Sequence, residues 1–181
     1  QLSPEEGMVS KIPVLSGHTN AVSVMSYGFD PYLSAWSPFH GAYFEGAESL
    51  LKIAAMGADP MKARLTFQEY FERMQSDESW GKPVAALLGA FQAQLDFQTP
   101  SIGGKDSMSG TYNDISVPPT LVSFAVATTT ADRIVSATLT SSGQKIYAIT
   151  IRKESNGLYN KDHFLRTCKA IKEVSKRGQL L

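Results

Sequence analysis

The sequence has one cysteine, no long apolar run and no excess of either charge among its 181 residues. A single cysteine, Cys168, excludes a disulfide within the chain and is typical of a reducing compartment. The 17 basic and 17 acidic residues cancel, so no net field favours nucleic acid or an anionic membrane as a partner. No apolar run approaches the roughly 20 residues that span a bilayer. We therefore expect a soluble, cytoplasmic protein.

The composition predicts a globular protein with a proper core, because 43% of the residues are hydrophobic. The chain begins with Gln1 rather than Met, so we expect a piece of a longer protein. Residues 1–16 have few apolar positions and are expected to be a tail or linker. The stretch Thr128–Gly143, rich in Thr, Ser and Ala, contains the expected boundary between a first domain, 17–131, and the incomplete beginning of a second, 132–181.

The spacing of apolar residues predicts strands and helices in turn, which indicates an α+β fold with helices layered on a sheet. Strands are predicted over 20–27, 62–71, 120–127 and 145–152, and helices over 41–56, 81–96 and 162–176. The stretch 28–40 holds Pro31, Pro38 and several aromatic residues, so we expect an irregular loop that covers the core or walls a cleft. Ser37, just before Pro38, has the character of a helix start.

Particular side chains carry further expectations. The helix over 81–96 is expected to bury its largest apolar side chains, namely Val84, Leu87, Leu88, Phe91 and Leu95. Cys168 falls on the inner side of its helix and is expected to be a packing residue rather than a nucleophile. Glu69 falls on the apolar side of its strand, so it should lie near the strand end or have a partner.

Pro100–Ser109 concentrates the chemistry of the chain between two apolar segments. Gly103 and Gly104 allow main-chain N–H groups to approach a ligand, and Lys105 adds a cation beside them, a combination suited to phosphate. Asp106 adds a carboxylate of the kind that holds Mg²⁺ against a phosphate. The alternative is a glycine turn with a solvated Lys-Asp pair. The spacing fits neither a Walker A loop nor a Rossmann fingerprint.

Glu48 and Lys52 lie four residues apart on the helix predicted over 41–56. This spacing places the two side chains on one face, beside the apolar stripe. Periodicity alone predicts an ion pair that stabilises the helix by a few tenths of a kcal/mol.

Several separated segments resemble phosphoribosylformylglycinamidine (FGAM) synthases of the large single-chain type. The strongest agreement lies in Tyr32–Gly41, Phe67–Phe71, Trp80–Gly89, Pro100–Gly110 and Val117–Phe124. The resemblance implies an aminoimidazole ribonucleotide synthetase-like fold: an N-terminal domain with helices packed on a mixed or antiparallel sheet, followed by the truncated start of the C-terminal α/β domain. The resemblance further implies that this chain corresponds to the second repeat of such a synthase.

The resemblance also implies a function, an ATP-dependent ligase of purine biosynthesis. Such enzymes convert formylglycinamide ribonucleotide and glutamine to formylglycinamidine ribonucleotide, using ATP, Mg²⁺ and ammonia from a glutaminase. On this basis the glutaminase and the other synthase domains are partners, and the chain alone is expected to be inactive. We also expect a homodimer through the sheet of the N-terminal domain. The alternative is a catalytically silent scaffold that holds a structural nucleotide and mediates domain pairing.

The same resemblance assigns roles to individual residues. Glu48 takes the place of a metal-binding glutamate, and Lys52 replaces an asparagine found in many relatives. An ammonium does not bind Mg²⁺ but can supply positive charge next to a phosphate. The segment Gly103, Gly104, Lys105, Asp106 and Ser107 is implied to face nucleotide or substrate phosphate, with Asp106 a second metal ligand. We expect these residues and Glu48 to share one hollow, which serves either the site of turnover or an auxiliary nucleotide site.

Overall fold

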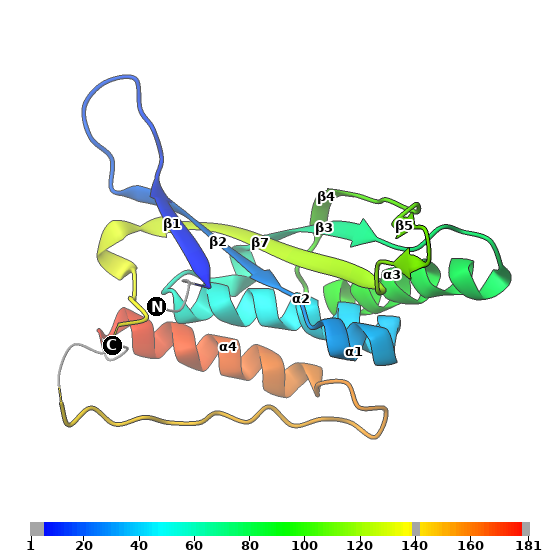
Figure 1. The fold of residues 1–181 in the computed structure, drawn as a ribbon. Helices are drawn as coiled ribbons and strands as arrows, with labels where there is room; N and C mark the ends of the chain where they lie inside the picture. Colours follow the sequence, from blue (N-terminus) through cyan, green and yellow to red (C-terminus); the bar gives the residue numbers. More distant parts are fainter. Residues whose placement is uncertain (1–5, 139–141, 179–181) are drawn as a thin grey trace.

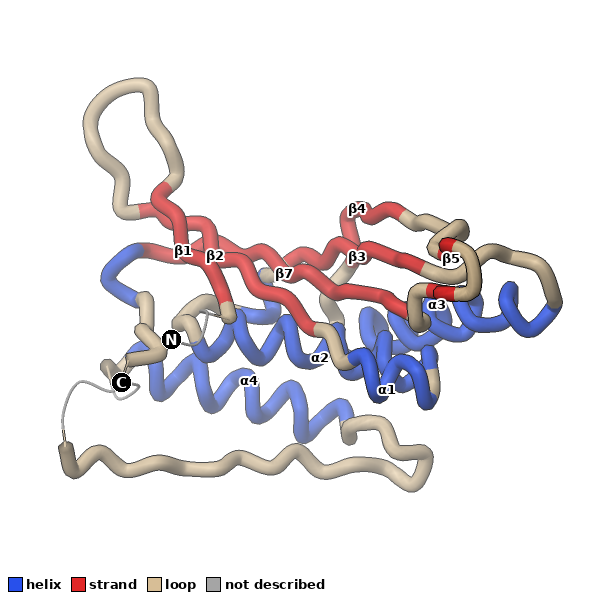
Figure 2. The backbone as a smooth tube through the Cα atoms, viewed as in Figure 1, coloured by secondary structure: helices blue, strands red, loops and turns tan. Residues whose placement is uncertain are grey.

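The computed structural model describes residues 6–138 and 142–178, and its centre is a five-stranded sheet (Figures 1 and 2). The strand order is β1–β2–β7–β3–β4, and all neighbours are antiparallel except the parallel pair β3 and β4. The strands are β1 (Gly7–Lys11), β2 (Ala21–Gly28), β3 (Arg64–Tyr70), β4 (Ser101–Lys105) and β7 (Thr120–Thr130). A separate small pair is formed by β5 (Thr111–Tyr112) and β6 (Ile115–Ser116).

The helices lie on one side of this sheet (Figure 1). They are α1 (Pro31–Trp36), α2 (Pro38–Ala55), α3 (Asp77–Phe97) and α4 (Lys161–Lys176), with 3₁₀ turns at Pro60–Lys62 and Ala131–Arg133. Helix α2 packs against β2 and β7, α3 lies beside α2, and α4 contacts both of these helices. Within the described ranges no helix has the length and apolarity to cross a bilayer. The predicted α+β layer of helices on a sheet is confirmed.

The core lies between the sheet and α2 and continues to α4. Leu50 and Ile53 of α2 are fully buried against Val24 of β2 and its neighbours, as the helical spacing predicts. Beyond α2, the rings of Phe97 and Phe164 stack with centroids 4.0 Å apart, which joins α3 to α4.

Cys168 of α4 is also buried in this core, which confirms it as a packing residue. Burial, and to a smaller extent the charge of Asp59, raises the pKa of its thiol to about 12. The thiolate, which is the nucleophilic form of cysteine, is therefore disfavoured.

The aromatic stretch 28–40 is helical, and the expectation of an irregular loop is wrong. Asp30 caps α1 by accepting hydrogen bonds from the N–H groups of Tyr32 and Leu33. Ser37 caps α2 by accepting from His40 N–H, so the predicted helix start at Ser37 is confirmed. Each cap is followed by a proline in the first helical turn, where the missing N–H has no partner to lose.

Two other predictions of local structure are wrong. Residues 145–152 are extended but form no strand within the described part of the chain, and Ile146, Tyr147 and Ile149 are exposed. The apolar run is present there without a neighbouring strand to pair with in the described residues. Conversely, the segment expected to be a tail contains β1, an edge strand that pairs with β2 through its backbone. Its side chains are mostly exposed, so no apolar alternation marks it in the sequence.

Helix α3 forms as predicted but presents the opposite face to the protein. Its buried residues are mostly small: Ser79, Pro83, Ala86, Gly89, Ala90, Ala93 and the larger Phe97. The large side chains expected inside are between 51 and 58% exposed, namely Val84, Leu87, Leu88, Phe91 and Leu95. The reason is the close approach of α3 to α2, which only small residues permit.

We expect Gly89→Ala to lower the free energy of unfolding by about 1–3 kcal/mol, the usual cost of overpacking. A Cβ atom at Gly89 would lie 2.0 Å from the carbonyl oxygen of Phe39 in α2, so the two helices would have to separate. Urea unfolding measures the change. The matched control is Gly81→Ala on the same helix, where a Cβ atom meets nothing within 4 Å. That control should be stabilising by about 1 kcal/mol or less, and equal stability of the two variants would contradict this account of the interface.

Candidate functional site

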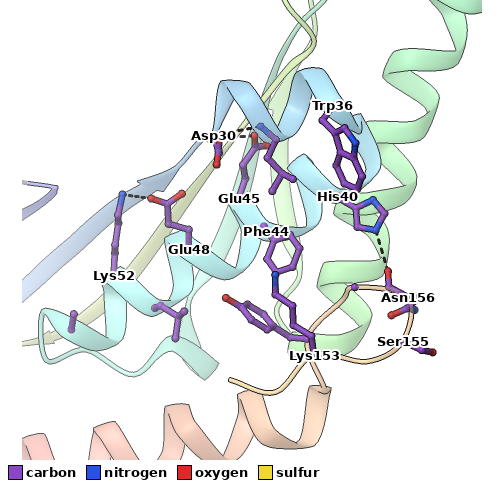
Figure 3. A pocket seen from close by; sticks show the side chains of 15 residues that line it. Asp30, Trp36, His40, Phe44, Glu45, Glu48, Lys52, Lys153, Ser155 and Asn156 are labelled. Carbon is purple, nitrogen blue, oxygen red and sulfur yellow. Dashed lines mark hydrogen bonds and ion pairs between the residues drawn. The ribbon is translucent and has the colours of Figure 1, made fainter. Parts of the chain in front are cut away.

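A cavity of about 900 Å³ opens between helices α1 and α2 and the turn that joins Lys153 to Tyr159 (Figure 3). Its walls combine aromatic side chains with charged ones of both signs. The lining includes Asp30, Trp36, His40, Phe44, Glu45, Glu48, Lys52, Lys153, Asn156 and Tyr159. Because α1 and α2 are both capped at their first turns, the helical part of the wall is firmly placed.

Glu48 and Lys52 both line this cavity and form the ion pair that their spacing predicts. Glu48 Oε1 lies 2.8 Å from Lys52 Nζ, and its Oε2 accepts a hydrogen bond from Phe29 N–H at 3.1 Å. Lys52 also pairs with Glu6 at 2.8 Å and lies 4.3 Å from the ring centre of Tyr27. Burial alone lowers the pKa of Lys52, but the hydrogen bonds to Glu48 and Glu6 outweigh it, and the pKa is raised. The ammonium therefore stays charged.

These contacts bear on whether Glu48 can hold a metal ion. Both of its oxygens already accept from N–H groups, so a cation could bind there only by displacing Lys52. Across residues 6–138 and 142–178 there is no group of three or more His, Cys, Asp or Glu side chains placed to hold a metal. As arranged here, Glu48 does not fit a resident metal ion.

Glu45 is a feature of the cavity that sequence reasoning missed. Its carboxyl is 1% exposed; one oxygen accepts from Ser34 Oγ at 2.5 Å and from Asp30 N–H at 3.4 Å. The other oxygen, Oε2, has no hydrogen-bond partner among the described residues. Burial raises the pKa of Glu45 to about 8, although the Ser34 hydrogen bond opposes the shift. The signal available in the sequence was a glutamate three positions before Glu48 on the same helix.

Gly103 and Gly104 lie in the edge strand β4, so the alternative of a glycine turn is wrong. Neither residue has a positive φ. Gly104 is needed for close approach, because a Cβ atom there would lie 2.3 Å from the carbonyl oxygen of Phe67 in β3. At Gly103 a Cβ atom would meet nothing within 4 Å, so the space beside its Cα atom is open, although its carbonyl oxygen accepts a hydrogen bond from Ser101 Oγ at 3.0 Å.

The residues after these glycines gather at the end of β3. Lys105 Nζ lies 4.0 Å from the ring centre of Tyr70, and Ser107 N–H donates to the carbonyl oxygen of Glu69 at 3.0 Å. Glu69 is 4% exposed, and its Oε1 has no partner in the described part of the chain. Burial, and secondarily the nearby charge of Asp106, raises the pKa of Glu69 to about 7. Glu69 lies next to the last residue of its strand, as predicted.

Asp106 therefore has Glu69, not Glu48, as its carboxylate neighbour. Two carboxyl groups, one with an unpartnered buried oxygen, fit an oxygen-preferring cation such as Mg²⁺. The cavity and this cluster are separate: strands β7 and β3 lie between β2 and β4, which puts β2 roughly 14 Å from β4 at about 4.8 Å per strand. None of residues 103–107 lines the cavity. The expected single hollow is not formed within one copy of the described chain.

No protein-family model and no curated protein matches the chain. Solved structures do. Phosphoribosylformylglycinamidine synthase II from Thermotoga maritima superimposes with a TM-score of 0.75 at 17% identity, over 96% of this chain and 26% of that chain. T. maritima PurL complexed with ATP has a TM-score of 0.74 at 17% identity, over 96% of this chain and 27% of that chain. T. maritima PurL complexed with FGAR has a TM-score of 0.75 at 17% identity, over 96% of this chain and 26% of that chain.

The chain has the FGAM synthase fold. It spans about a quarter of the length of these synthase chains. The aminoimidazole ribonucleotide synthetase-like fold implied by the sequence resemblance is thereby confirmed. Within this synthase fold, the cavity lies on the helix side of the sheet and the Glu69–Asp106 cluster at one sheet edge.

We expect Glu45→Gln to make the protein more stable than the wild type at alkaline pH. The folded-state pKa of Glu45, about 8, lies above its ordinary 4.5. Its contribution to stability is therefore complete below pH 4.5 and is lost as the pH rises through 8, because the unfolded chain releases the proton more readily. Glutamine keeps the shape and stays neutral. Thermal unfolding between acidic and alkaline pH measures the difference.

The matched control is Glu173→Gln at a fully exposed position on α4. It should not gain stability relative to the wild type as the pH rises. A Glu45→Gln protein whose melting temperature follows that of the wild type at every pH would show that Glu45 is ionised in the folded state.

Proposed function

We propose that this chain is part of an ATP-dependent amidotransferase of purine biosynthesis. The reaction is the conversion of formylglycinamide ribonucleotide and glutamine to formylglycinamidine ribonucleotide, and the chain supplies nucleotide- and phosphate-binding residues. The support is the shared fold with synthases whose structures hold ATP and FGAR, together with a cavity of suitable size and lining. The remaining synthase domains, including the glutaminase, complete the enzyme in this proposal.

The cavity beside α2 is the observation that carries the proposal. Its volume of about 900 Å³ lies in the range of pockets that hold small ligands. Trp36, Phe44 and Tyr159 offer apolar surfaces to a base, while the ammonium groups of Lys52 and Lys153 suit phosphate oxygens. His40 is held between Ser37 Oγ at 2.8 Å and the carbonyl oxygen of Asn156 at 3.2 Å, which ties the turn to α2. Phosphoryl transfer depends mainly on such positioning and charge.

The Glu69–Asp106 cluster supplies a second set of residues for the same chemistry. Lys105 lies over Tyr70 on the open face of the sheet, where its ammonium favours a phosphate. Glu69 is buried on the helix side of the same strand, and its carboxyl together with that of Asp106 favours Mg²⁺ at the strand end. When bound there, Mg²⁺ would neutralise charge on phosphate oxygens. We assign Glu69 and Asp106 as its ligands in preference to Glu48, whose oxygens are already occupied. Lys52 and Glu48 then belong to the nucleotide cavity.

The sheet offers a surface for pairing with a second copy. Helices cover one face only, and on the other Tyr27, Tyr70 and Phe124 are between 39 and 41% exposed. A homodimer through this face covers these side chains and shields the sheet edges. The alternative function, a silent scaffold that holds a structural nucleotide, uses the same cavity and the same pairing. The scaffold differs from the enzyme only in that the nucleotide bound in the cavity is not converted to product.

We expect Lys153→Ala to weaken ATP binding at the cavity about tenfold, and Lys105→Ala to weaken the binding of phosphate with Mg²⁺ at the separate Glu69–Asp106 cluster by a similar factor, the effect of losing roughly one charged hydrogen bond. Glu48→Ala should instead strengthen ATP binding, because it removes a carboxylate from the cavity wall and frees Lys52 from one of its two ion pairs. Isothermal titration calorimetry measures the affinities. The control is Lys169→Ala on the exposed side of α4, which should bind like the wild type. Unchanged affinity in all three test variants would contradict the proposed site.

We expect Phe124→Lys to reduce association through the sheet, because it places a charge in the middle of the open face. Phe124 pairs with Tyr27 across β2 and with Thr66 across β3, so a cation there disturbs three strands of the surface. Sedimentation at micromolar concentration measures the assembly size, and Lys169→Glu is the control. A wild type that is monomeric under these conditions would count against pairing.

A further inference from the structure

The outer face of α3 is apolar along most of the helix. Six large side chains on this face are between 51 and 58% exposed: Trp80, Val84, Leu87, Leu88, Phe91 and Leu95. We call these six residues the α3 stripe. They span about four turns, or roughly 22 Å at 1.5 Å per residue. Single exposed apolar residues are ordinary on protein surfaces, but a continuous row of this kind marks an interaction site.

The stripe is not needed to build the core, because the opposite side of α3 does that with small residues. Ala86, Ala90 and Ala93 are at most 2% exposed against α2 and its surroundings. Helix α3 thus has two apolar sides, a small one that packs inward and a large one that faces outward. Solvent exposure of the large side chains is costly, at about 25 cal/mol for each Å² left uncovered.

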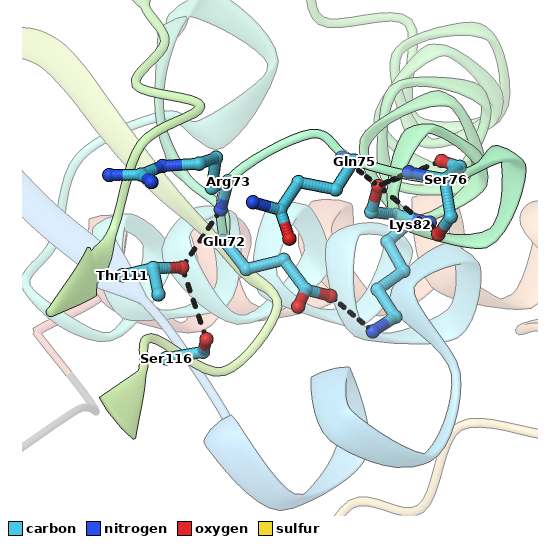
Figure 4. A network of polar contacts seen from close by, with 8 residues as sticks. Glu72, Arg73, Gln75, Ser76, Lys82, Thr111 and Ser116 are labelled. Atoms are coloured by element: carbon cyan, nitrogen blue, oxygen red, sulfur yellow. Dashed lines mark hydrogen bonds and ion pairs between the residues drawn. The ribbon is translucent and has the colours of Figure 1, made fainter. Parts of the chain in front are cut away.

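The stripe contains no charge that would have to be buried with it. Between Glu78 and Leu95, every exposed position of α3 is apolar or glycine. Lys82, at its margin, is half-buried and its ammonium is held by Glu72 from the loop before the helix (Figure 4). Asp96, at the other end, accepts hydrogen bonds from Tyr43 and Gln92. The side chains of Lys82 and Asp96 are therefore already engaged within the chain.

The arrangement of the stripe is self-complementary. Its members repeat at intervals of three and four residues, the spacing by which two helices interlock along their length. The midpoint falls between Leu87 and Leu88. A two-fold axis at that point sets Trp80 opposite Leu95 of an antiparallel partner helix and Val84 opposite Phe91, a large side chain facing a smaller one in each case. The exposed Gly81 leaves room beside Trp80.

We propose that the α3 stripe is a docking surface for the same stripe of a second copy of this chain. An aromatic side chain has roughly 150–250 Å² to bury, and an aliphatic one less, so the six half-exposed side chains present at most roughly 450–750 Å² per copy. A symmetric pair then buries at most roughly 900–1,500 Å², a range that includes the area of about 1,000 Å² that specific interfaces require. Two-fold pairing of this kind is the commonest form of protein self-association.

This surface is distinct from the open face of the sheet proposed for pairing above. Helix α3 lies in the helix layer (Figure 1). Tyr27 and Phe124 follow Ser26 and Ser123, whose hydroxyls bond to Ser49 of α2, so by strand alternation they point away from that layer. The docking of α3 does not rest on the proposed enzymatic function, and it can be tested separately from pairing through the sheet. Where both interfaces form, each copy contacts two others.

Disulfide cross-linking of Leu88→Cys tests the proposal directly. Leu88 lies next to the expected two-fold axis, so two introduced thiols meet and oxidise to a covalent dimer visible on a non-reducing gel. The native Cys168 is buried and does not compete. Lys169→Cys, exposed on α4, is the control for random collisions. A dimer yield several times that of the control is the expected result, and an equal yield overturns the proposal.

Sedimentation of charge variants gives the second test. Leu88→Lys should lose association through α3 and keep the fold, because its side chain is already half-exposed, and circular dichroism checks the fold. In the Phe124→Lys background, where the sheet face is blocked, the protein should remain dimeric until Leu88→Lys is added. If Phe124→Lys alone is monomeric at micromolar concentration, or if Leu88→Lys leaves the assembly unchanged, another partner covers this face and the proposal is wrong.

Discussion

The close approach of α2 and α3 is the constraint on which the rest of the helix layer depends. Gly89 admits the backbone of Phe39, and a Cβ atom at Gly46 would lie 3.2 Å from the Cβ atom of Ala93. Such contacts are possible only if small residues face the partner helix, so the large side chains of α3 turn outward. The same packing brings Phe97 under Tyr43, with ring centroids 5.1 Å apart, and creates the platform on which Phe164 of α4 stacks. The close approach of α3 to α2 at Gly89 and Phe39 thus influences both which residues of α3 are buried and which are exposed.

Helix α2 links this packing to the candidate site. Its buried stripe, including Leu50 and Ile53, fixes the rotation of the helix against the sheet. That rotation leaves Glu45, Glu48 and Lys52 along one side, facing the turn 153–159. The geometry explains why an ion pair and a buried carboxyl occur one turn apart on the same helix. Glu48 is reached by Phe29 N–H and by Lys52, whereas Glu45 is enclosed under α1 and keeps one oxygen without a partner.

The sequence predicted elements whose stability comes from a single buried stripe, such as α2, β2 and α4, because periodicity reports burial directly. Prediction from the sequence was wrong where the structure of a segment depends on a neighbouring strand or helix. Residues 145–152 have the apolar run of a strand but pair with none in the described chain, and β1 pairs without any apolar pattern. In α3 both sides of the helix are apolar, so the apolar spacing wrongly predicts that the larger side chains are the buried ones. The site failed for the same reason: whether Asp106 meets Glu48 or Glu69 depends on strand order, and β4 joins the sheet beside β3.

The charge balance of the cavity shows why Glu45 matters for a phosphate ligand. With Glu45 ionised, the wall would hold Asp30, Glu45 and Glu48 against Lys52 and Lys153, and its net charge would repel an anion. The pKa of about 8 keeps Glu45 mostly protonated at neutral pH, so the remaining charges of the lining balance. Glu6 pairs with Lys52 from outside the lining and adds a further negative charge beside it. A triphosphate carries several negative charges and needs more than a neutral wall. Under the proposed function, the additional positive charge comes with the nucleotide, as Mg²⁺, or from another segment beside the cavity, which is the physical reason for expecting the proposed site to be completed on assembly.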